Sequence, residues 1–299
     1  MTNSTLCILG CGNLGGAILK SLIDGPKDKE GSAPFNRFIA CVRSQKSEQR
    51  LAAQFPNRSQ SLVITRDNIQ AVRDSDVVVL GVDPAVVEKV LSTPGLSEAL
   101  STKLLISVAA GWTRQKLETT LYGSPTTNSN ASGRAWVVRT LPNIAASVSQ
   151  GLTAIEISEP EVPEHYQQIT DAVFDNLGKT VHIPPTLMDA TTAVAGSTPA
   201  FFAVIVDAMI DAAVAVGVPR DLARTMTVQA MTGTAALLQS GMHPAVLRDQ
   251  GTSPEGCTIG GLMVMEEAGV RGHVGRALRE AVTIARLMDG TRHLNDTRE

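Results

Sequence analysis

The chain has 299 residues, enough for two domains of about 150 residues each, which excludes a peptide or a disulfide-stapled miniprotein. Hydrophobic residues make up 43% and charged residues 18%, a composition too apolar for intrinsic disorder. A net charge of −3 and only 3% aromatic residues leave no basic field and few stacking platforms, so we expect no nucleic-acid partner.

Short apolar runs alternate with helical patterns up to about residue 155, which is typical of βαβ units and a parallel sheet. The predicted strands are 6–9, 38–42, 77–80, 104–108, 135–139 and 153–157. The predicted helices between them are 13–23, 44–54, 84–91 and 113–121. Two polar segments, 24–36 and 122–134, interrupt this alternation and are expected to be surface loops.

Helical patterns dominate the second half, where residues 181–183 form the last good strand run before Pro184. The predicted helices are 187–218, 220–239, 244–250, 258–267 and 270–288. We therefore predict an α/β domain over residues 1–184 and an all-α domain over residues 185–299.

The most apolar stretch, 199–218, is long enough to span a membrane, but Asp207 and Asp211 lie inside it. We predict a helix buried between protein surfaces and no membrane partner. The four cysteines form no C-x-x-C pair, and the first residues have no basic signal-peptide region. We therefore expect reduced thiols in a cytoplasmic protein.

Three glycines follow the first predicted strand and lead into a helix, as Gly10-Cys11-Gly12-Asn13-Leu14-Gly15. In this context, Gly10 permits the tight turn, Gly12 allows the backbone to approach a pyrophosphate, and Gly15 allows close packing of helix on strand. Glycine turns also occur for structural reasons alone, but the strand before and the helix after favour dinucleotide binding by a Rossmann domain.

The turn after the second predicted strand carries Arg43, Ser44 and Lys46. Two cations and a hydroxyl at this position suit the additional 2′-phosphate of NADP, so we predict NADPH over NADH. The alternative is that these residues only solvate a helix start. Two further loops, at 81–84 with Val82 and at 108–111 with Ala109, Ala110 and Gly111, lie where a bound dinucleotide would pass.

A second candidate anion site lies at residues 253–261, where small residues and hydroxyls precede a helix. Its backbone N–H groups and the hydroxyls of Ser253 and Thr258 could hold a small carboxylate, although an elaborate N-cap explains the same residues. The five histidines show no metal-ligand spacing and no catalytic triad, so we predict no metal.

These motifs and their order resemble the pyrroline-5-carboxylate reductase family over nearly the whole chain. The resemblance is carried by the glycine loop, Val108 to Gly111, Arg139 to Asn143, Ala195 to Ala200 and, most specifically, His243 to Ile259. It implies an N-terminal Rossmann domain, a C-terminal helical dimerisation domain forming an intertwined homodimer, and NAD(P)H-dependent reduction of a cyclic imine acid to proline.

The resemblance also implies roles for individual residues. The glycine loop with Asn13 and Leu14 would hold the pyrophosphate, and 108–111 with Asn143 would lie beside the nicotinamide. Ser253, Gly256 and Cys257 would bind the substrate carboxylate, and the catalytic Thr258 hydroxyl would lie near the ring nitrogen.

Two acidic residues depart from the family pattern. Asp83 stands where a lysine is usual, and Glu255 replaces a glycine in the substrate loop. These departures keep three alternatives open: reduction of an alkylated pyrroline carboxylate, reduction of another cyclic imine in specialised metabolism, and a non-catalytic regulator that senses NADPH or an imine.

Overall fold

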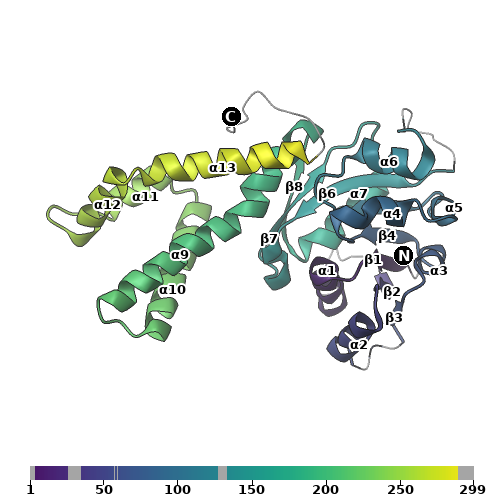
Figure 1. Ribbon diagram of the computed structural model, residues 1–299, viewed down its shortest axis with the longest axis horizontal. Coiled ribbons are helices and arrows are strands. Elements are labelled where there is room, and N and C mark those ends of the chain that lie inside the picture. The colour runs from purple at the N-terminus through teal and green to yellow at the C-terminus, as the bar shows by residue number, and fades with distance from the viewer. Residues whose placement is uncertain (1–3, 26–34, 57, 59, 127–132, 289–299) are drawn as a thin grey trace. The chain divides into compact units, whose positions relative to one another are not determined.

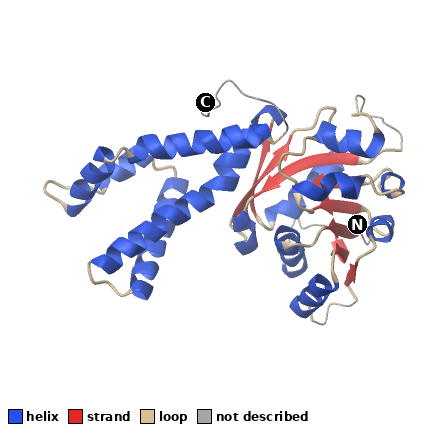
Figure 2. Ribbon diagram, in the orientation of Figure 1, coloured by secondary structure: helices blue, strands red, loops and turns tan. Residues whose placement is uncertain are grey.

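The computed structural model describes residues 4–25, 35–56, 58, 60–126 and 133–288, and contacts divide the chain into two compact units. Unit 1 comprises the chain up to Gly196 and the end of the last helix from Ile284, and unit 2 begins at Ser197. Figures 1 and 2 show that unit 1 contains the strands and that unit 2 is helical.

Unit 1 is built on an eight-stranded sheet with the order β3-β2-β1-β4-β5-β6-β7-β8. All neighbours pair in parallel except β6 and β7, which are antiparallel. This is a mostly parallel Rossmann-type sheet, in which the first half runs 3-2-1-4. The strands are β1 Ser4–Leu9, β2 Phe35–Cys41, β3 Leu62–Thr65, β4 Val77–Leu80, β5 Leu104–Ser107, β6 Trp136–Pro142, β7 Gly151–Glu156 and β8 Gly178–Ile183.

Helices cover both faces of the sheet because successive strand residues point to opposite sides. One core contains Leu6 and Ile8 with residues of α1 Asn13–Asp24, α2 Gln45–Gln54 and α7 Glu164–Asp175. The other contains Cys7 and Leu9 with residues of α3 Asn68–Arg73, α4 Val87–Leu91, α5 Leu96–Ala99 and α6 Arg114–Tyr122. The predicted α/β class is therefore confirmed, with the carboxyl ends of β1, β2 and β4 brought together.

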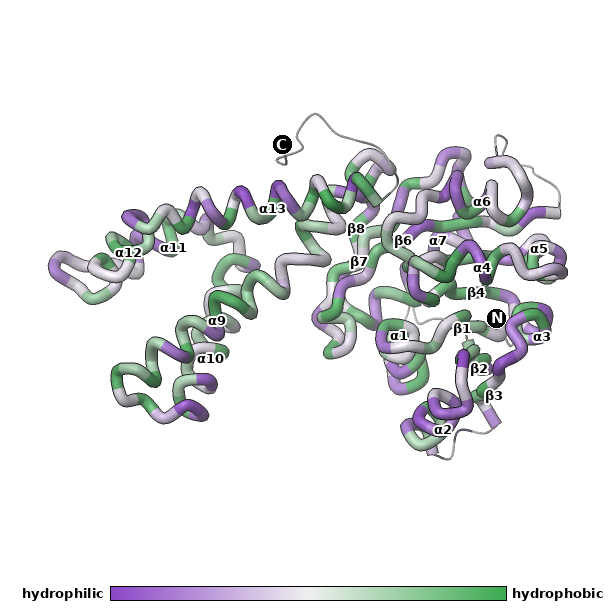
Figure 3. The backbone as a smooth tube through the Cα atoms, in the orientation of Figure 1, coloured by the Kyte–Doolittle hydropathy of each residue, from purple (hydrophilic) through white to green (hydrophobic). Residues whose placement is uncertain are grey.

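Unit 2 consists of helices throughout its described residues. They are α9 Thr198–Ala215, α10 Arg220–Gln239, α11 Pro244–Gln250, α12 Cys257–Glu267 and most of α13 Val270–Leu287. Large apolar side chains remain exposed here, among them Val204 at 71%, Val216 at 81% and Met263 at 66%. Figure 3 shows hydrophobic residues distributed along α9 and α10. Exposed apolar surface on this scale is typical of a protein interface.

One stretch of the described chain, Pro185–Ala215, is long and apolar enough to cross a membrane by length and composition alone. Asp207 and Asp211 are both exposed within it, and Asp211 accepts a hydrogen bond from Arg220 at 2.8 Å. Two carboxyl groups in the last third of a lipid-facing helix would be costly, so a protein interface fits this stretch better.

Several predicted elements need correction. Sequence reasoning missed β3, α3, α5 and α7, and β8 begins at Gly178 rather than at Val181. The single helix predicted over 187–218 is wrong, because η3 Pro185–Leu187, α8 Met188–Thr191 and a π-helical segment, η4 Thr192–Ser197, precede α9. The segment predicted as one helix at 84–91 divides into η1 Pro84–Val86 and α4. Most of the two predicted surface loops, 26–34 and 127–132, lies outside the described residues.

The division after Gly196 differs from the boundary predicted near Pro184 for a physical reason. Met188 is fully buried and packs with Leu141 and Ala154 of the sheet. Asp189 accepts a hydrogen bond from the buried Arg139 at 3.2 Å. These contacts tie the first turns of the helical segment to unit 1.

Candidate functional site

The glycine loop joins β1 to α1 with very little space around two of its glycines. A Cβ on Gly10, whose φ is +92°, would lie 2.6 Å from the backbone nitrogen of Val82. A Cβ on Gly15 would lie 2.4 Å from the carbonyl oxygen of Gly10. Both positions therefore require glycine, because real Cβ atoms do not approach backbone atoms so closely.

Gly12 is different, because a Cβ at this position would meet nothing within 4 Å. It is the N-cap of α1 and supplies no side-chain cap, so no capping side chain occupies the first-turn N–H groups of α1. Asn13 and Leu14 belong to this turn. An uncapped helix start beside free space is suited to a phosphate group, since the N–H groups and the helix dipole both favour an anion.

A groove runs from this helix start across the ends of β2 and β4. A cavity of about 520 Å³ is lined by Gly10, Cys11, Gly12, Val42, Arg43, Ser47, Arg50, Gly81, Val82, Asp83, Ala85 and Val86. A second cavity of about 350 Å³ is lined by Gly10, Cys41, Val42, Arg43, Arg66, Asn68, Val82, Val86, Lys89, Val90 and Thr93. We call these two cavities the large and the small cavity. They share Gly10, Arg43 and Val82, three of the predicted cofactor residues.

The other residues predicted at the turn after β2 lie differently. Ser44 is the N-cap of α2, where its Oγ accepts a hydrogen bond from the Ser47 N–H at 3.2 Å. Neither Ser44 nor Lys46 lines the two cavities, whereas Ser47 and Arg50 line the large one. Sequence reasoning missed Arg50, although its position two turns into the predicted helix, on the same face as Ser47, was a usable signal.

Two residues of the groove bear on its charge. The carboxylate of Asp83 lines the large cavity and accepts a hydrogen bond from the Ala85 N–H at 2.9 Å, so it caps η1. The thiol of Cys11 is 2% exposed, and burial raises its pKa to about 12. Cys11 therefore contributes a neutral wall near neutral pH, and Asp83 is the single acidic residue among the described residues that line either cavity.

The second predicted cofactor loop follows β5. Ala109 is buried, Ala110 is packed against the Leu141 cluster, and Gly111 has a φ of +73°. A Cβ on Gly111 would lie 2.9 Å from Cβ of Met288, at the end of the chain's last helix. This loop is thus closely packed on the unit 1 side.

Asn143, which directly follows β6, connects this loop to the π-helical segment. Its Nδ2 donates to the carbonyl oxygen of Ala195 at 2.9 Å, and its Oδ1 accepts from the Leu152 N–H at 3.3 Å. Four residues after Ala195 stands Pro199, which has no N–H to donate in the usual helical pattern. Asn143 therefore supplies the missing donor, which fixes its loop to the start of the helical region.

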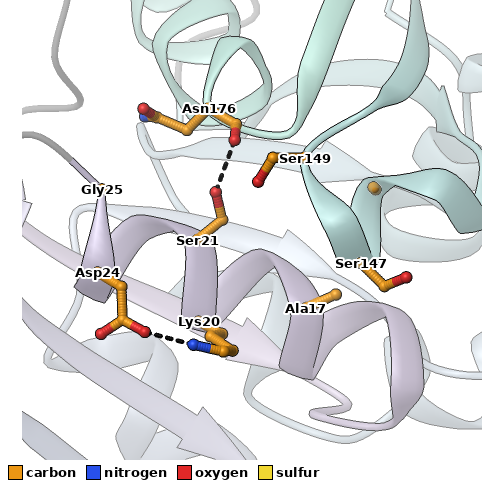
Figure 4. A pocket seen from close by; sticks show the side chains of 9 residues that line it. Ala17, Lys20, Ser21, Asp24, Gly25, Ser147, Ser149 and Asn176 are labelled. Atoms are coloured by element: carbon orange, nitrogen blue, oxygen red, sulfur yellow. Dashed lines mark hydrogen bonds and ion pairs between the residues drawn. The ribbon is translucent and has the colours of Figure 1, made fainter.

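A third cavity, of about 400 Å³, lies between α1 and η2 Ile144–Val148 (Figure 4). Its lysine, Lys20, is paired with Asp24, and the Ser21 hydroxyl donates to the carbonyl oxygen of Asn176 at 2.9 Å. Its α1 residues run from Ala17 to Asp24 and so reach the C-terminal end of that helix, where the helix dipole disfavours anions. The groove over β2 and β4 is thus the better site for a phosphorylated ligand.

The predicted substrate loop lies in unit 2, before α12. Gly256 is the N-cap of α12 and makes no side-chain cap bond, so Thr258 lies inside the helix and is not its cap. A Cβ on Gly256 would lie 2.5 Å from Oγ of Ser253, and the Gly256 N–H donates to the Ser253 carbonyl at 3.0 Å. Glu255 has a φ of +58°, a left-handed conformation that favours glycine.

This geometry leaves the loop open to a ligand. Cys257 and Thr258 are exposed, and the Thr258 hydroxyl bonds to no atom of the described chain. The alternative interpretation of Thr258 as a helix cap does not agree with this arrangement. Among the described residues, no group of three or more His, Cys, Asp or Glu side chains could hold a metal ion.

Comparison with known proteins gives two family matches. Residues 185–288 match the model described as "Pyrroline-5-carboxylate reductase dimerisation". Residues 5–111 match the model described as "NADP oxidoreductase coenzyme F420-dependent". The first covers nearly all of the described helical region, and the second covers the glycine loop and the groove.

Individual proteins agree with these matches. The chain is 41% identical to a pyrroline-5-carboxylate reductase of Lophium arboricola, covering 98% of this chain and 96% of that protein. It is 36% identical to one of Neurospora crassa, with the same two coverages. Its fold is similar to the crystal structure of a Plasmodium falciparum pyrroline carboxylate reductase with NADP bound, at a TM-score of 0.80 and 24% identity, covering 97% of this chain and all of that one.

Proposed function

The chain belongs to the pyrroline-5-carboxylate reductase family, and we propose that it transfers a hydride from NADPH to the imine carbon of 1-pyrroline-5-carboxylate or of an alkylated analogue. The product is proline or the matching proline derivative. The observation that carries this proposal is the match, over nearly the full length, to relatives named for this reaction. The open start of α1 beside a cationic groove supports it independently.

The residues present fit the cofactor, which when bound supplies the hydride. The N–H groups of Gly12, Asn13 and Leu14 would bind the pyrophosphate at the uncapped start of α1. Arg43, which lines both cavities, would bind the 2′-phosphate and favour NADPH over NADH. Ser44 acts there by holding the start of α2.

The nicotinamide side of the site would be formed by Ala109, Ala110, Gly111 and Asn143. The loop at Ala109 to Gly111 is tightly packed, and Asn143 is fixed by its bond to Ala195. We infer that these residues hold the nicotinamide end in one orientation. A fixed orientation matters because an iminium carbon is already electrophilic, so alignment supplies most of the rate.

The substrate would be held at the start of α12. The hydroxyl of Ser253 and the N–H groups of Gly256 and Cys257 would bind its carboxylate, aided by the helix dipole. The hydroxyl of Thr258 is free to accept a hydrogen bond from the protonated ring nitrogen, which keeps the imine in its reactive charged form. Hydride addition at carbon then converts this iminium to an amine.

We also propose a homodimer formed through the helical region, with domains at 1–184 and 185–299, the first turn of the second domain packing on the sheet of the first through Met188 and Asp189. The match of residues 185–288 to a dimerisation family and the exposed apolar residues of α9, α10 and α12 support the homodimer. Cys7, Cys11, Cys41 and Cys257 are free thiols, which supports a cytoplasmic location. Light scattering that gives a monomer mass at micromolar concentration would contradict the dimer.

The test of function is a panel of cyclic imines with purified protein and NADPH, followed by loss of nicotinamide absorbance. We expect the highest kcat/KM for a five-membered ring carrying a carboxylate. A higher value for a six-membered ring or for an imine without a carboxylate would identify a different reductase. NADPH binding by calorimetry without turnover of any imine would refute the enzyme and favour a regulator.

A further inference from the structure

The small cavity is lined by more cations than the predicted 2′-phosphate residue Arg43. Besides Arg43, it is lined by Arg66, at the end of β3, and by Lys89, on α4. These three cations come from segments far apart in the sequence, and the strand order 3-2-1-4 brings their elements to one edge of the sheet. None of the described residues that line this cavity is acidic.

Positive charge is concentrated here although the whole chain has a net charge of −3. Four cations, Arg43, Arg50, Arg66 and Lys89, line the two cavities, against the single carboxylate of Asp83. Only Arg66 among these four pairs with a described carboxylate, that of Glu48 at 3.4 Å. Both side chains of this pair are substantially exposed, so the pair is weak and Arg66 can exchange it for a phosphate.

The two cavities differ in what else they offer. The large cavity contains Gly12 and Arg50 and therefore lies at the open start of α1. The small cavity lacks Gly12 and instead adds Val90 to the shared valines Val42, Val82 and Val86. An apolar wall next to cations suits an adenine ring and its ribose phosphate, whereas the helix start suits the pyrophosphate.

We propose that Arg66 and Lys89 act with Arg43 as a three-cation clamp for the 2′-phosphate of NADPH, so that cofactor selectivity comes from the ends of β2 and β3 and from α4 instead of from the end of β2 alone. This inference rests on the proposed function for the identity of the cofactor. Arg50 lies at the pyrophosphate end of the groove and contributes equally to the binding of NADPH and of NADH. Glu48 holds Arg66 near the cavity when no phosphate is bound.

The clamp is tested by calorimetry on the full-length protein with two fragments, 2′,5′-ADP and 5′-AMP, which differ only in the 2′-phosphate. Arg66→Gln and Lys89→Gln are each expected to lower the affinity for 2′,5′-ADP about fivefold or more and to change the affinity for 5′-AMP less than about twofold. Arg50→Gln should lower the affinity for both fragments to a similar extent. Lys20→Gln, in the separate cavity of Figure 4, is the matched control and should change neither.

Circular dichroism and the thermal midpoint of each variant establish that it is folded. Equal losses for 2′,5′-ADP and 5′-AMP in folded Arg66→Gln and Lys89→Gln proteins, or no loss at all, would overturn the clamp. The outcome is independent of turnover. A selective loss in a protein that reduces no pyrroline would refute the proposed reaction alone, and unchanged selectivity in an active enzyme would refute the clamp alone.

Discussion

Replacing Gly15 by alanine places a methyl group 2.4 Å from the carbonyl oxygen of Gly10, about 1 Å inside a normal contact. Gly10 cannot move away freely, because it is itself packed against the Val82 backbone: a Cβ built on Gly10 would lie 2.6 Å from the backbone nitrogen of Val82. Overpacking of this kind costs about 1–3 kcal/mol of unfolding free energy. At about 2–4 °C for each kcal/mol, the thermal midpoint should fall measurably.

Two neighbouring glycines provide matched controls. A Cβ on Gly12 or on Gly16 meets no atom within 4 Å. Gly12→Ala should therefore keep its thermal midpoint but place a methyl group where the pyrophosphate must approach, weakening NADPH by about tenfold or more. Gly16→Ala lies within α1 and should raise stability by up to about 1 kcal/mol without loss of NADPH affinity.

The assays are differential scanning fluorimetry and calorimetric titration with NADPH. The account requires three different results from three chemically identical substitutions: a loss of stability for Gly15, a loss of affinity for Gly12, and neither for Gly16. Unchanged NADPH affinity in Gly12→Ala would show that no phosphate lies at the start of α1 and would refute the dinucleotide site.

Three further predictions concern single side chains. Thr258→Val should fold normally, because Gly256 is the N-cap of α12. Its kcat should fall about tenfold, because the lost hydrogen bond is worth about 1.5 kcal/mol. Unchanged kcat and KM would show that Thr258 does not belong to the site. Glu255→Gly should lower KM for a carboxylated imine by removing a negative charge, and it should raise the thermal midpoint slightly because glycine tolerates the φ of +58° at this position. Glu255→Gln should lower KM in the same way without the gain in stability. An unchanged KM in both variants would show that Glu255 points away from the substrate. Burial raises the pKa of the Glu156 carboxyl above its ordinary value, so the folded state binds the proton more tightly than the unfolded state. Wild-type stability should therefore decline, relative to Glu156→Gln, as the pH rises above the ordinary carboxyl pKa; parallel stability curves for the two proteins at all pH values would contradict this.

The glycine loop was predictable because its signal is local. A strand, three glycines at fixed spacing and a helix occur within a few consecutive residues, and the structure shows the close contacts that this spacing implies. In contrast, β3 is four residues long, with its second residue exposed and its last two partly exposed, so it lacks a long apolar run. The helix α7 buries only Thr170, Ala172, Val173 and Phe174, which is too narrow a stripe to be distinctive.

Residues that meet only through the sheet could not be found from spacing. Arg66 and Lys89 join Arg43 because β3 and β4 lie on either side of the β1–β2 pair, and no local pattern indicates this. Similarly, Asn143 donates a hydrogen bond to the carbonyl oxygen of Ala195, which lies four residues before Pro199, a residue with no N–H. Sequence reasoning located the site through its glycines, and the sheet topology determined which charged side chains surround it.

The most direct test of the central claim follows the hydride itself. The protein is incubated with 1-pyrroline-5-carboxylate and NADPH deuterated at the transferred position of nicotinamide C4, and the product is analysed by NMR and mass spectrometry. The account predicts proline carrying one deuterium at the former imine carbon. If no pyrroline carboxylate, alkylated or not, acquires deuterium at that carbon, the proposed reduction is wrong.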